Sequence, residues 1–378
     1  MAKQSLEEIE QLLKPIALAP LCENPLISVL TASCNYARYL GKAIESVLGQ
    51  TYTNFEMIIC DDGSTDDSCE VVERFARRDA RVRLVAKQNG GQASAWNAAY
   101  RESKGQIICF LDADDRFLPQ KLETVVQAFR CNPDSGFAGD RMIRIDAAGR
   151  RDCTASSTAD PPSGWYGAAI VRYGATPCGL PAGSAMCLRR EICHSIFPMP
   201  EGFWICADGV VMSLAPLMTP VIGIPAQLTE YRYHGRNLIN SRRIRNEAPG
   251  GTSQIGPMGW ELTREYLGKV NSVLVETFPS YDKCRGTLLG AYVQGRLQGW
   301  GGALSAYRRL LRAENFLTFR VAARWFWRLS ILLPRPVFRY ALSPNLLKQL
   351  FWWTVEARRR IFASSAPVRR APNRTGYD

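Results

Sequence analysis

A chain of 378 residues, 46% of them hydrophobic, is long enough for one large domain or two smaller ones with buried cores. Its start, MAKQSLEEIEQLL, lacks a basic flank followed by an apolar run, and no stretch reaches the ~20 uninterrupted apolar residues that span a bilayer, so neither a secreted nor an integral membrane protein is expected. Most of the net charge of +12 lies in residues 320–378, which hold eleven Arg and one Lys against Glu356 and Asp378.

The twelve cysteines are scattered, without a C-x-x-C pair. Cys60 and Cys109 fall inside expected strands, where a free thiol behaves as a small apolar group. This pattern favours reduced thiols and a cytoplasmic location, and it argues against a disulfide framework or a cysteine metal site.

In the first half, short β-rich runs alternate with helical periods. Strands are expected at 27–31, 55–60, 82–86 and 106–111. Between the first two strands, apolar residues from Leu40 to Leu48 recur at i, i+3, i+4, i+7 and i+8, as on one face of a helix, and shorter stripes lie at 71–75 and 93–100. The alternation predicts an α/β fold whose mainly parallel sheet is covered by helices on both faces.

Polar side chains gather just after the expected strands. They are Ser33 and Asn35 after the first, Asp62 after the second, Asn89 after the third, and Asp112, Asp114 and Asp115 after the fourth. Ligands of such sheets bind beyond the carboxyl ends of the strands. These loops are therefore expected to form one site.

The pattern weakens beyond residue 135. Residues 151–185 are rich in Gly, Pro, Ser and Ala and are expected to be loops, followed by a helix at 208–217 and a strand at 221–224. From about 255 the periodicity is helical. The expected organisation is a helical leader at 1–24, an α/β domain at 25–245 with halves 25–135 and 136–245, a helical C-terminal region at 246–363 and a disordered basic tail at 364–378.

Several motifs in order resemble the family 2 glycosyltransferases. They are "ISVLTASCNYARYLGKAIESVLGQTYTNFEMIICDDGSTDD", "NGGQASAWNAAYRESKGQIICFLDADD" and "RFLPQKLE", with a fainter match in "CADGVVMSLAPLMTPVIGIPAQLTEYRYHGRNL". The resemblance covers roughly residues 26–240. It implies a GT-A fold and an inverting glycosyltransferase that uses a nucleotide-sugar, UDP-sugar being favoured.

By this resemblance, Asp114 is a ligand of Mg²⁺ or Mn²⁺, and Asp112 shares the metal or faces the donor ribose. Such a cation neutralises the charge that develops on the leaving diphosphate. It needs few protein ligands, because substrate phosphates and water supply the others. Asp115 is expected either to support Asp114 from behind or to cap the next helix.

The resemblance places Asp62 at the nucleobase, with Ser33, Asn35 and Asn89 also near the nucleotide. The family's usual Pro-Thr-Tyr-Asn is Ala32-Ser33-Cys34-Asn35 here, so the stacking aromatic is missing. A turn residue is the alternative role for Asp62.

The general base corresponds to Asp208, although the usual Glu-Asp is Ala-Asp in this chain. An ordinary helix N-cap is the alternative role, and the two are compatible. His234 matches a segment that closes over the donor diphosphate, with a solvated or core histidine as the alternative role, and Arg236 and Asn237 are nearby candidates for phosphate contact. Ser184 is a candidate for the acceptor pocket.

Alternatives remain for the whole chain. A processive synthase is disfavoured, because the Arg of Q-x-x-R-W is missing and no membrane span is visible. A transferase-like nucleotide- or glycan-binding module without catalysis is the non-enzymatic alternative. In residues 320–362, Arg residues are interleaved with Trp and Phe. This pattern indicates either peripheral attachment to the inner membrane face, where a lipid-linked acceptor would be found, or a helical subdomain packed on the protein. Nucleic-acid binding is not expected.

Overall fold

The structure, a computed structural model, describes residues 4–152, 160–174, 176, 179–234, 237 and 255–279. The chain divides into two compact units: 14–163 with 179–269, here called the α/β unit, and 1–13 with 164–178 and 270–378. In the second unit, the described helices α1 (Leu6–Leu12) and α11 (Ser272–Thr277) each contact α6 (Gly167–Tyr173). Every site residue expected from sequence belongs to the α/β unit.

An eight-stranded sheet with the order β3-β2-β1-β4-β7-β6-β8-β5 forms the centre of the α/β unit. Its strands are β1 (Ile27–Ser33), β2 (Phe55–Asp62), β3 (Val82–Lys87), β4 (Ile107–Phe110), β5 (Arg116–Phe117), β6 (Phe137–Ile145), β7 (Met186–Arg189) and β8 (Val221–Arg232). The first four are parallel to one another. β7 runs antiparallel to β4 and β6, β8 is parallel to β6, and β5 is antiparallel to β8, so the other half of the sheet is mixed.

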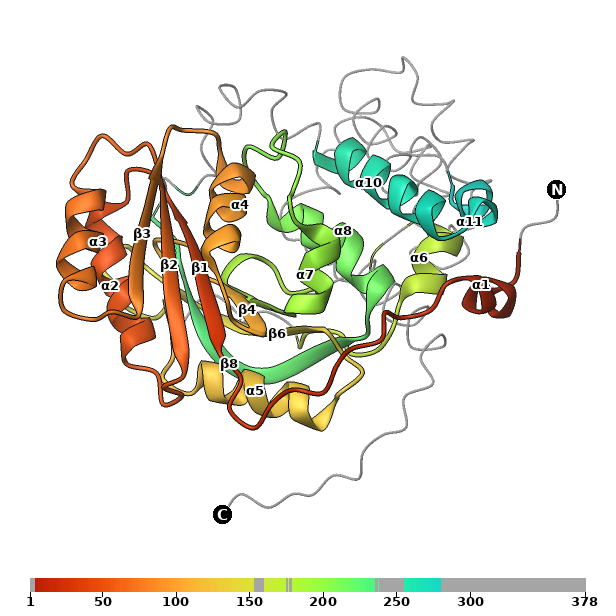
Figure 1. The fold of residues 1–378 in the computed structure, drawn as a ribbon, viewed down its shortest axis with the longest axis horizontal. Helices are drawn as coiled ribbons and strands as arrows, with labels where there is room; N and C mark the ends of the chain where they lie inside the picture. Colours follow the sequence, from red (N-terminus) through yellow and green to blue (C-terminus); the bar gives the residue numbers. More distant parts are fainter. Residues whose placement is uncertain are drawn as a thin grey trace, which may run out of the picture. The chain divides into compact units, whose positions relative to one another are not determined.

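Helices cover both faces of the parallel half. The helices α2 (Ala37–Leu48) and α3 (Ser68–Ala76) lie on one face, and α4 (Gln92–Glu102) lies on the other (Figure 1). The expected stripe on α2 is buried from Leu40 to Val47. On the opposite face, Trp96 of α4 packs on Phe110 of β4 with ring centroids 4.5 Å apart. The predicted α/β class and its two-sided helical cover are confirmed.

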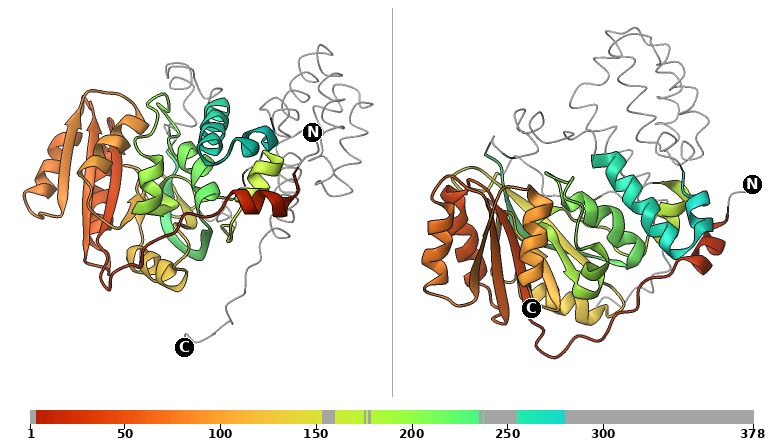
Figure 2. Two further views of the ribbon diagram at one scale, coloured as in Figure 1. Left: turned by 45° about the vertical axis from the view of Figure 1, so that its right-hand side comes forward. Right: turned by 45° about the horizontal axis from the view of Figure 1, so that its top comes forward.

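The mixed half is also covered on both sides. The helix α5 (Lys121–Cys131) contacts β6 and β8, and the helices α7 (Arg190–Ile196) and α8 (Asp208–Met218) pack together on the opposite face (Figure 2). The helix α10 (Ile255–Val270) lies against α8, where a Cβ on Gly259 would lie 2.6 Å from Ser213 Oγ. The helices α8 and α10 therefore pack directly on each other.

The weaker predictions beyond residue 135 need correction. The strand expected at 221–224 continues to Arg232, because it pairs with β6 along most of its length. Residues 151–185 are not loops throughout, since α6 and the short turn η1 (Gly183–Ala185) lie there. The expected leader helix is limited to α1 in the described residues. The expected domain limits stay predictions, and the basic segment 320–378 lies outside the described residues.

Candidate functional site

Asp62, the last residue of β2, is held by the loop that follows β3. Its Oδ1 accepts hydrogen bonds from Lys87 Nζ (2.8 Å) and the Gly90 amide (2.9 Å), and its Oδ2 accepts one from the Gly91 amide (2.7 Å). Gly91 has a φ of +85°, and a Cβ there would lie 2.8 Å from Trp204, so glycine is required. Of the four acceptor positions of a carboxylate, one remains open on Oδ2.

The loop after β1 contains two residues with different roles. Asn35 has a φ of +61°, and its Oδ1 accepts a hydrogen bond from the Thr65 amide (2.8 Å), which ties this loop to the one after β2. Ser33 is 2% exposed, and its hydroxyl has no hydrogen-bond partner among the described residues. Across the loop, Asn89 Nδ2 donates to Cys34 Sγ (3.4 Å). Asn35 therefore holds the loop after β1 against the loop after β2, whereas the Ser33 hydroxyl has no hydrogen-bond partner among the described residues.

The first turn of α4 connects Asp62 with the acidic loop after β4. The Gly91 amide binds Asp62, and the next residue, Gln92, makes a long hydrogen bond from Nε2 to Asp112 Oδ1 (3.5 Å). Gln92 Oε1 accepts a hydrogen bond from the Ala207 amide (2.9 Å), one residue before Asp208. The positive end of the helix dipole therefore faces the acidic residues.

Asp115 is a structural acid. It is 1% exposed and accepts hydrogen bonds from Ser184 Oγ (2.6 Å) and the Arg232 amide (2.8 Å). The expectation that it caps a helix is wrong, because β5 follows it and α5 begins only after Gln120. Its hydrogen bonds instead attach the acidic loop to η1 and β8.

Asp114 stands opposite a histidine. Its Oδ2 lies 2.9 Å from His234 Nε2 and 3.4 Å from Asn237 Nδ2. The His234 ring stacks on Tyr39 with centroids 5.0 Å apart. No hydrogen bond to Asp114 Oδ1 is present among the described residues, so this oxygen is available to a ligand. Arg236, expected beside His234, lies outside the described residues.

Asp208 begins α8, and the N-cap is Ala207. Burial raises the pKa of Asp208, while the backbone groups of Gly183 and Gly209 near its carboxylate act in the opposite direction. The residue two positions earlier, Cys206, has a φ of +56°, which is uncommon for a non-glycine residue and gives a sharp turn into the helix. Asp208 is therefore placed by a strained turn and by η1.

Negative charge is concentrated at this edge of the sheet. Burial raises the pKa of Asp112 to about 8, and the charges of Asp114 and Asp208 act in the same direction. Burial and the charges of Asp114 and Asp112 also raise the pKa of Asp115. Such a group of carboxylates suits a hard divalent cation with oxygen ligands.

The described residues contain no group of three or more His, Cys, Asp or Glu side chains arranged to hold a metal ion. Asp112 and Asp114 could still hold Mg²⁺ or Mn²⁺, since these ions are bound by one or two carboxylates together with substrate phosphates and water. The open Oδ1 of Asp114 and the raised pKa of Asp112 fit this arrangement.

The raised pKa of Asp112 predicts a pH-dependent stability of the metal-free protein. In the folded state the Asp112 carboxyl keeps its proton up to about pH 8, whereas in the unfolded chain it loses the proton near the ordinary pKa of 3.8. The free energy of unfolding therefore falls as pH rises between these two values. We expect the loss of melting temperature from pH 5 to pH 8 to be smaller in Asp112→Asn by about 7–15 °C, measured by thermal unfolding without metal. An equal loss of melting temperature in the wild type and in Asp112→Asn would show that the pKa of Asp112 is not raised in the folded protein.

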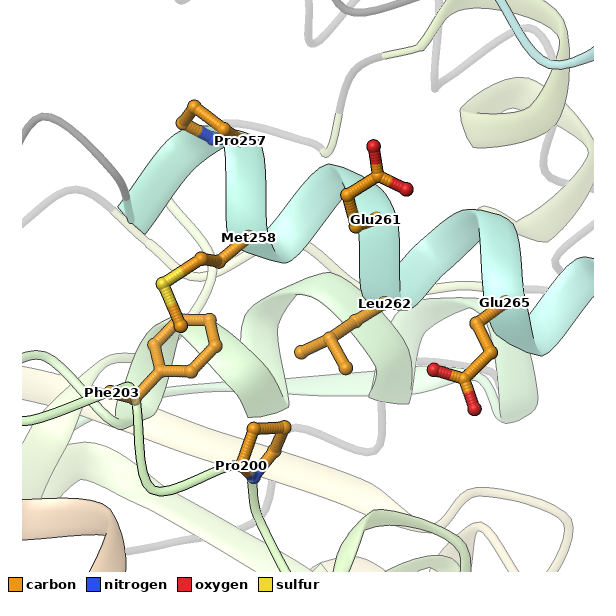
Figure 3. A pocket seen from close by; sticks show the side chains of 7 residues that line it. All are labelled: Pro200, Phe203, Pro257, Met258, Glu261, Leu262 and Glu265. Carbon is orange, nitrogen blue, oxygen red and sulfur yellow. The ribbon is translucent and has the colours of Figure 1, made fainter.

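A groove of about 470 Å³ lies beside the loop that leads to Asp208. Its lining is Pro200, Phe203, Pro257, Met258, Glu261, Leu262 and Glu265, and Met258 of α10 extends toward Phe203 (Figure 3). The lining is mainly apolar, with two carboxylates from α10. The α/β unit therefore presents a mainly apolar groove between α10 and the loop that precedes α8.

Several residues at the site were missed from sequence. They are Tyr39, Gln92, Lys121 and Arg232. Gln92 and Lys121 lie inside the quoted motifs "NGGQ" and "PQKLE", but nothing in those motifs shows which atoms they contact. Arg232 Nε donates to the Asp114 carbonyl (2.7 Å), and its guanidinium lies 5.0 Å from the Tyr39 ring centroid. These contacts arise only when β8 folds against the acidic loop.

Comparison with known proteins supports the resemblance. A family model described as "Glycosyl transferase family 2" matches residues 28–197. An uncharacterized glycosyltransferase of Nostoc sp. is 32% identical over 246 residues, which are 64% of this chain and 74% of that protein. The chondroitin synthase of Pasteurella multocida is 37% identical over 129 residues, 34% of this chain but only 13% of that enzyme.

Among solved structures, S. aureus TarS 1–349 in complex with UDP-GlcNAc has a TM-score of 0.48 at 16% identity, and the match covers 89% of this chain and 90% of that one. The family itself is established by the sequence relatives and by the family model. The chain belongs to glycosyltransferase family 2, and its α/β unit has the GT-A fold.

Proposed function

We propose that the protein is an inverting, metal-dependent glycosyltransferase that adds one sugar from a nucleotide-sugar to a hydroxyl of a glycan or lipid-linked acceptor. The observation that carries the proposal is the proximity of Asp208 to Asp112. Gln92 bridges them, because its Nε2 donates to Asp112 Oδ1 (3.5 Å) and its Oε1 accepts from the Ala207 amide beside Asp208 (2.9 Å), and the charge of Asp208 raises the pKa of Asp112. A displacement in one step needs a base beside the acceptor hydroxyl and a cation-binding carboxylate beside the diphosphate, and Asp208 and Asp112 lie at the same edge of the sheet.

In the proposed reaction, Asp208 accepts the proton of the acceptor hydroxyl as its oxygen bonds to the anomeric carbon. The bond from that carbon to the diphosphate breaks, and the electron pair leaves with the diphosphate. A single base opposite the leaving group gives inversion. The raised pKa of Asp208 suits a general base, because catalytic efficiency is best when the pKa approaches the working pH. A cation held by Asp112 and Asp114 would supply positive charge to the departing diphosphate.

The hydrogen bonds of Asp62 support a uracil nucleotide. Lys87, Gly90 and Gly91 occupy three acceptor positions of its carboxylate, which leaves one for a ligand. The N3–H of uracil or thymine presents a single donor. Guanine presents N1–H and N2–H₂ side by side and would need two acceptors. UDP is therefore the proposed nucleotide, and GDP is disfavoured.

The proposal is tested by calorimetric titration of UDP, dTDP and GDP with and without Mn²⁺. We expect UDP to bind only with Mn²⁺ and at least about tenfold more tightly than GDP, since one unpaired buried donor costs about 1–3 kcal/mol. In Asp62→Asn the preference should vanish, whereas Asp79→Asn, a carboxylate paired with Arg81 at the surface, should match the wild type.

Three results would contradict this proposal. Tighter binding of GDP would overturn the nucleotide assignment. UDP binding without release of UDP from any UDP-sugar would favour the catalytically inactive binding module. No binding of any nucleotide would remove the donor site altogether.

The setting of the reaction is also a proposal. The name of the P. multocida relative, chondroitin synthase, supports polysaccharide synthesis as the process. A cytoplasmic protein attached to the inner membrane face through residues 320–362 would meet a lipid-linked acceptor there. None of the described helices has the length and apolar character to cross a bilayer. Binding of the full chain to anionic vesicles measures this attachment.

A further inference from the structure

The turn η1 contacts both sides of the proposed reaction. The backbone of Gly183 lies close enough to the Asp208 carboxylate to lower its pKa, against the effect of burial, which raises it. One residue later, Ser184 Oγ accepts a hydrogen bond from the Asp112 amide (2.9 Å) and donates one to Asp115 Oδ2 (2.6 Å). Gly183 has a φ of +49°, and a Cβ there would lie 3.0 Å from Asp112 Oδ2. A shift of this turn would therefore move the base relative to the acidic loop.

A buried lysine anchors the turn from below. Lys121, the first residue of α5, is 0% exposed, and its ammonium donates to the Ser184 carbonyl (2.9 Å), Thr229 Oγ1 (2.8 Å) and the carboxylate of Asp140. Thr229 Oγ1 donates in turn to Asp140 Oδ2 (2.7 Å). All three ammonium hydrogens are used, and the partners come from η1, β6 and β8.

Stability alone does not explain this arrangement. Replacing a buried ion pair by apolar residues of similar size is often neutral or stabilising, because desolvation of both charges offsets their attraction. The directional contact is the one from Lys121 to the Ser184 carbonyl, at the point where the turn meets the acidic loop. A cation at this position restricts the turn in a way that an apolar residue cannot.

We propose that Lys121, held by Asp140 and Thr229, is a positioning residue: it fixes the Gly183–Ser184 turn and thereby the placement of Asp208 relative to Asp112. The inference rests on the proposed function for its catalytic consequence. Its structural part, the anchoring of the turn by Lys121 and the attachment of the acidic loop to it through Ser184, stands on the contacts alone.

The first test compares two buried serines with the same hydrogen-bond pattern. Ser28 of β1 is 0% exposed, and its Oγ donates to Glu56 (2.6 Å) and accepts from the Gly105 amide (2.8 Å), at the opposite edge of the sheet. Ser184→Ala and Ser28→Ala should lose similar stability. Only Ser184→Ala should lower kcat, by about 100-fold, because a misplacement of about 1 Å costs that much. Equal kcat values per folded protein would overturn the proposal.

The second test removes the ion pair without leaving a lone buried charge. In Lys121→Met/Asp140→Leu we expect a melting temperature near or above that of the wild type together with a kcat about 100-fold lower. The amides of Asp112 and Gly183 should exchange their hydrogens about tenfold faster, whereas the amide of Gly105 should not change, as measured by hydrogen–deuterium exchange.

The two readouts separate the two proposals. Unchanged exchange at Asp112 and Gly183, or unchanged kcat in the double variant, shows that Lys121 has no positioning role. If the wild type transfers no sugar while both amides exchange faster in the double variant, the proposed function fails and the anchoring of the turn is confirmed.

Discussion

Replacing Asp208 by Asn is expected to lower kcat by about 10³-fold, within the range that general acid–base catalysis contributes. Asparagine keeps the shape of the side chain but cannot accept the proton of the acceptor hydroxyl. It also keeps an oxygen beside the backbone of Gly183 and Gly209, so the fold should persist. Steady-state transfer from a UDP-sugar, together with thermal unfolding, measures both effects.

The control measurement for Asp208→Asn is its affinity for the nucleotide, compared with that of the wild type. Because Asp208 is proposed to act on the acceptor, the affinity for UDP with Mn²⁺ should stay within about threefold of the wild type, a difference below 1 kcal/mol. A variant that turns over at the wild-type rate would exclude Asp208 as the base. A variant that loses nucleotide affinity as strongly as kcat would indicate a structural role.

Replacing Asp114 by Asn is expected to lower kcat/KM by about 10³-fold. Added Mn²⁺ should no longer strengthen the binding of UDP to the variant. A cation contributes several kcal/mol of transition-state stabilisation, and about 1.4 kcal/mol corresponds to a factor of ten. The open Oδ1 of Asp114 is the atom expected to bind the cation, while Oδ2 faces His234. Calorimetry across Mn²⁺ concentrations, followed by kinetics, measures the change.

The neutral surface variant Asp79→Asn serves again as the control for Asp114→Asn. It should keep the wild-type Mn²⁺ dependence. If Asp114→Asn also keeps that dependence, Asp114 does not hold the cation, and Asp112 alone becomes the candidate ligand. Full activity of the wild type in a metal chelator would contradict the metal-dependent mechanism as a whole.

The first half of the fold was predictable because its signals are local. The β1–α2–β2–α3–β3–α4–β4 series follows alternating apolar runs and helical stripes; the first two connections join neighbouring strands, and the third returns from β3 to place β4 beside β1. The mixed half was harder to predict. β6 and β7 were missed, and β8 was expected to end eight residues too early, at Ile224, because these strands pair with segments that are distant in the sequence, β7 antiparallel to β4 and β6, and β8 parallel to β6.

The sequence alone determined the succession of strands and helices along the chain in the parallel half. It also determined which loops carry the polar residues and to which family the chain belongs. Local periodicity and motif spacing are enough for that. Only the tertiary structure decided how each acid is used: Asp115 is bound by Ser184 and Arg232, whereas Asp114 keeps an open oxygen. It also decided that Lys121 lies buried under η1.

The physical reason is the separation of the partners along the chain. Asp115 lies 117 residues from Arg232, and Lys121 lies 63 residues from Ser184, so no local pattern can encode these hydrogen bonds. They form when β8 and η1 fold against the acidic loop, and burial then raises the pKa of Asp112 and of Asp208. Residue type and spacing bring the carboxylates to one edge of the sheet, and long-range packing assigns each of them its surroundings.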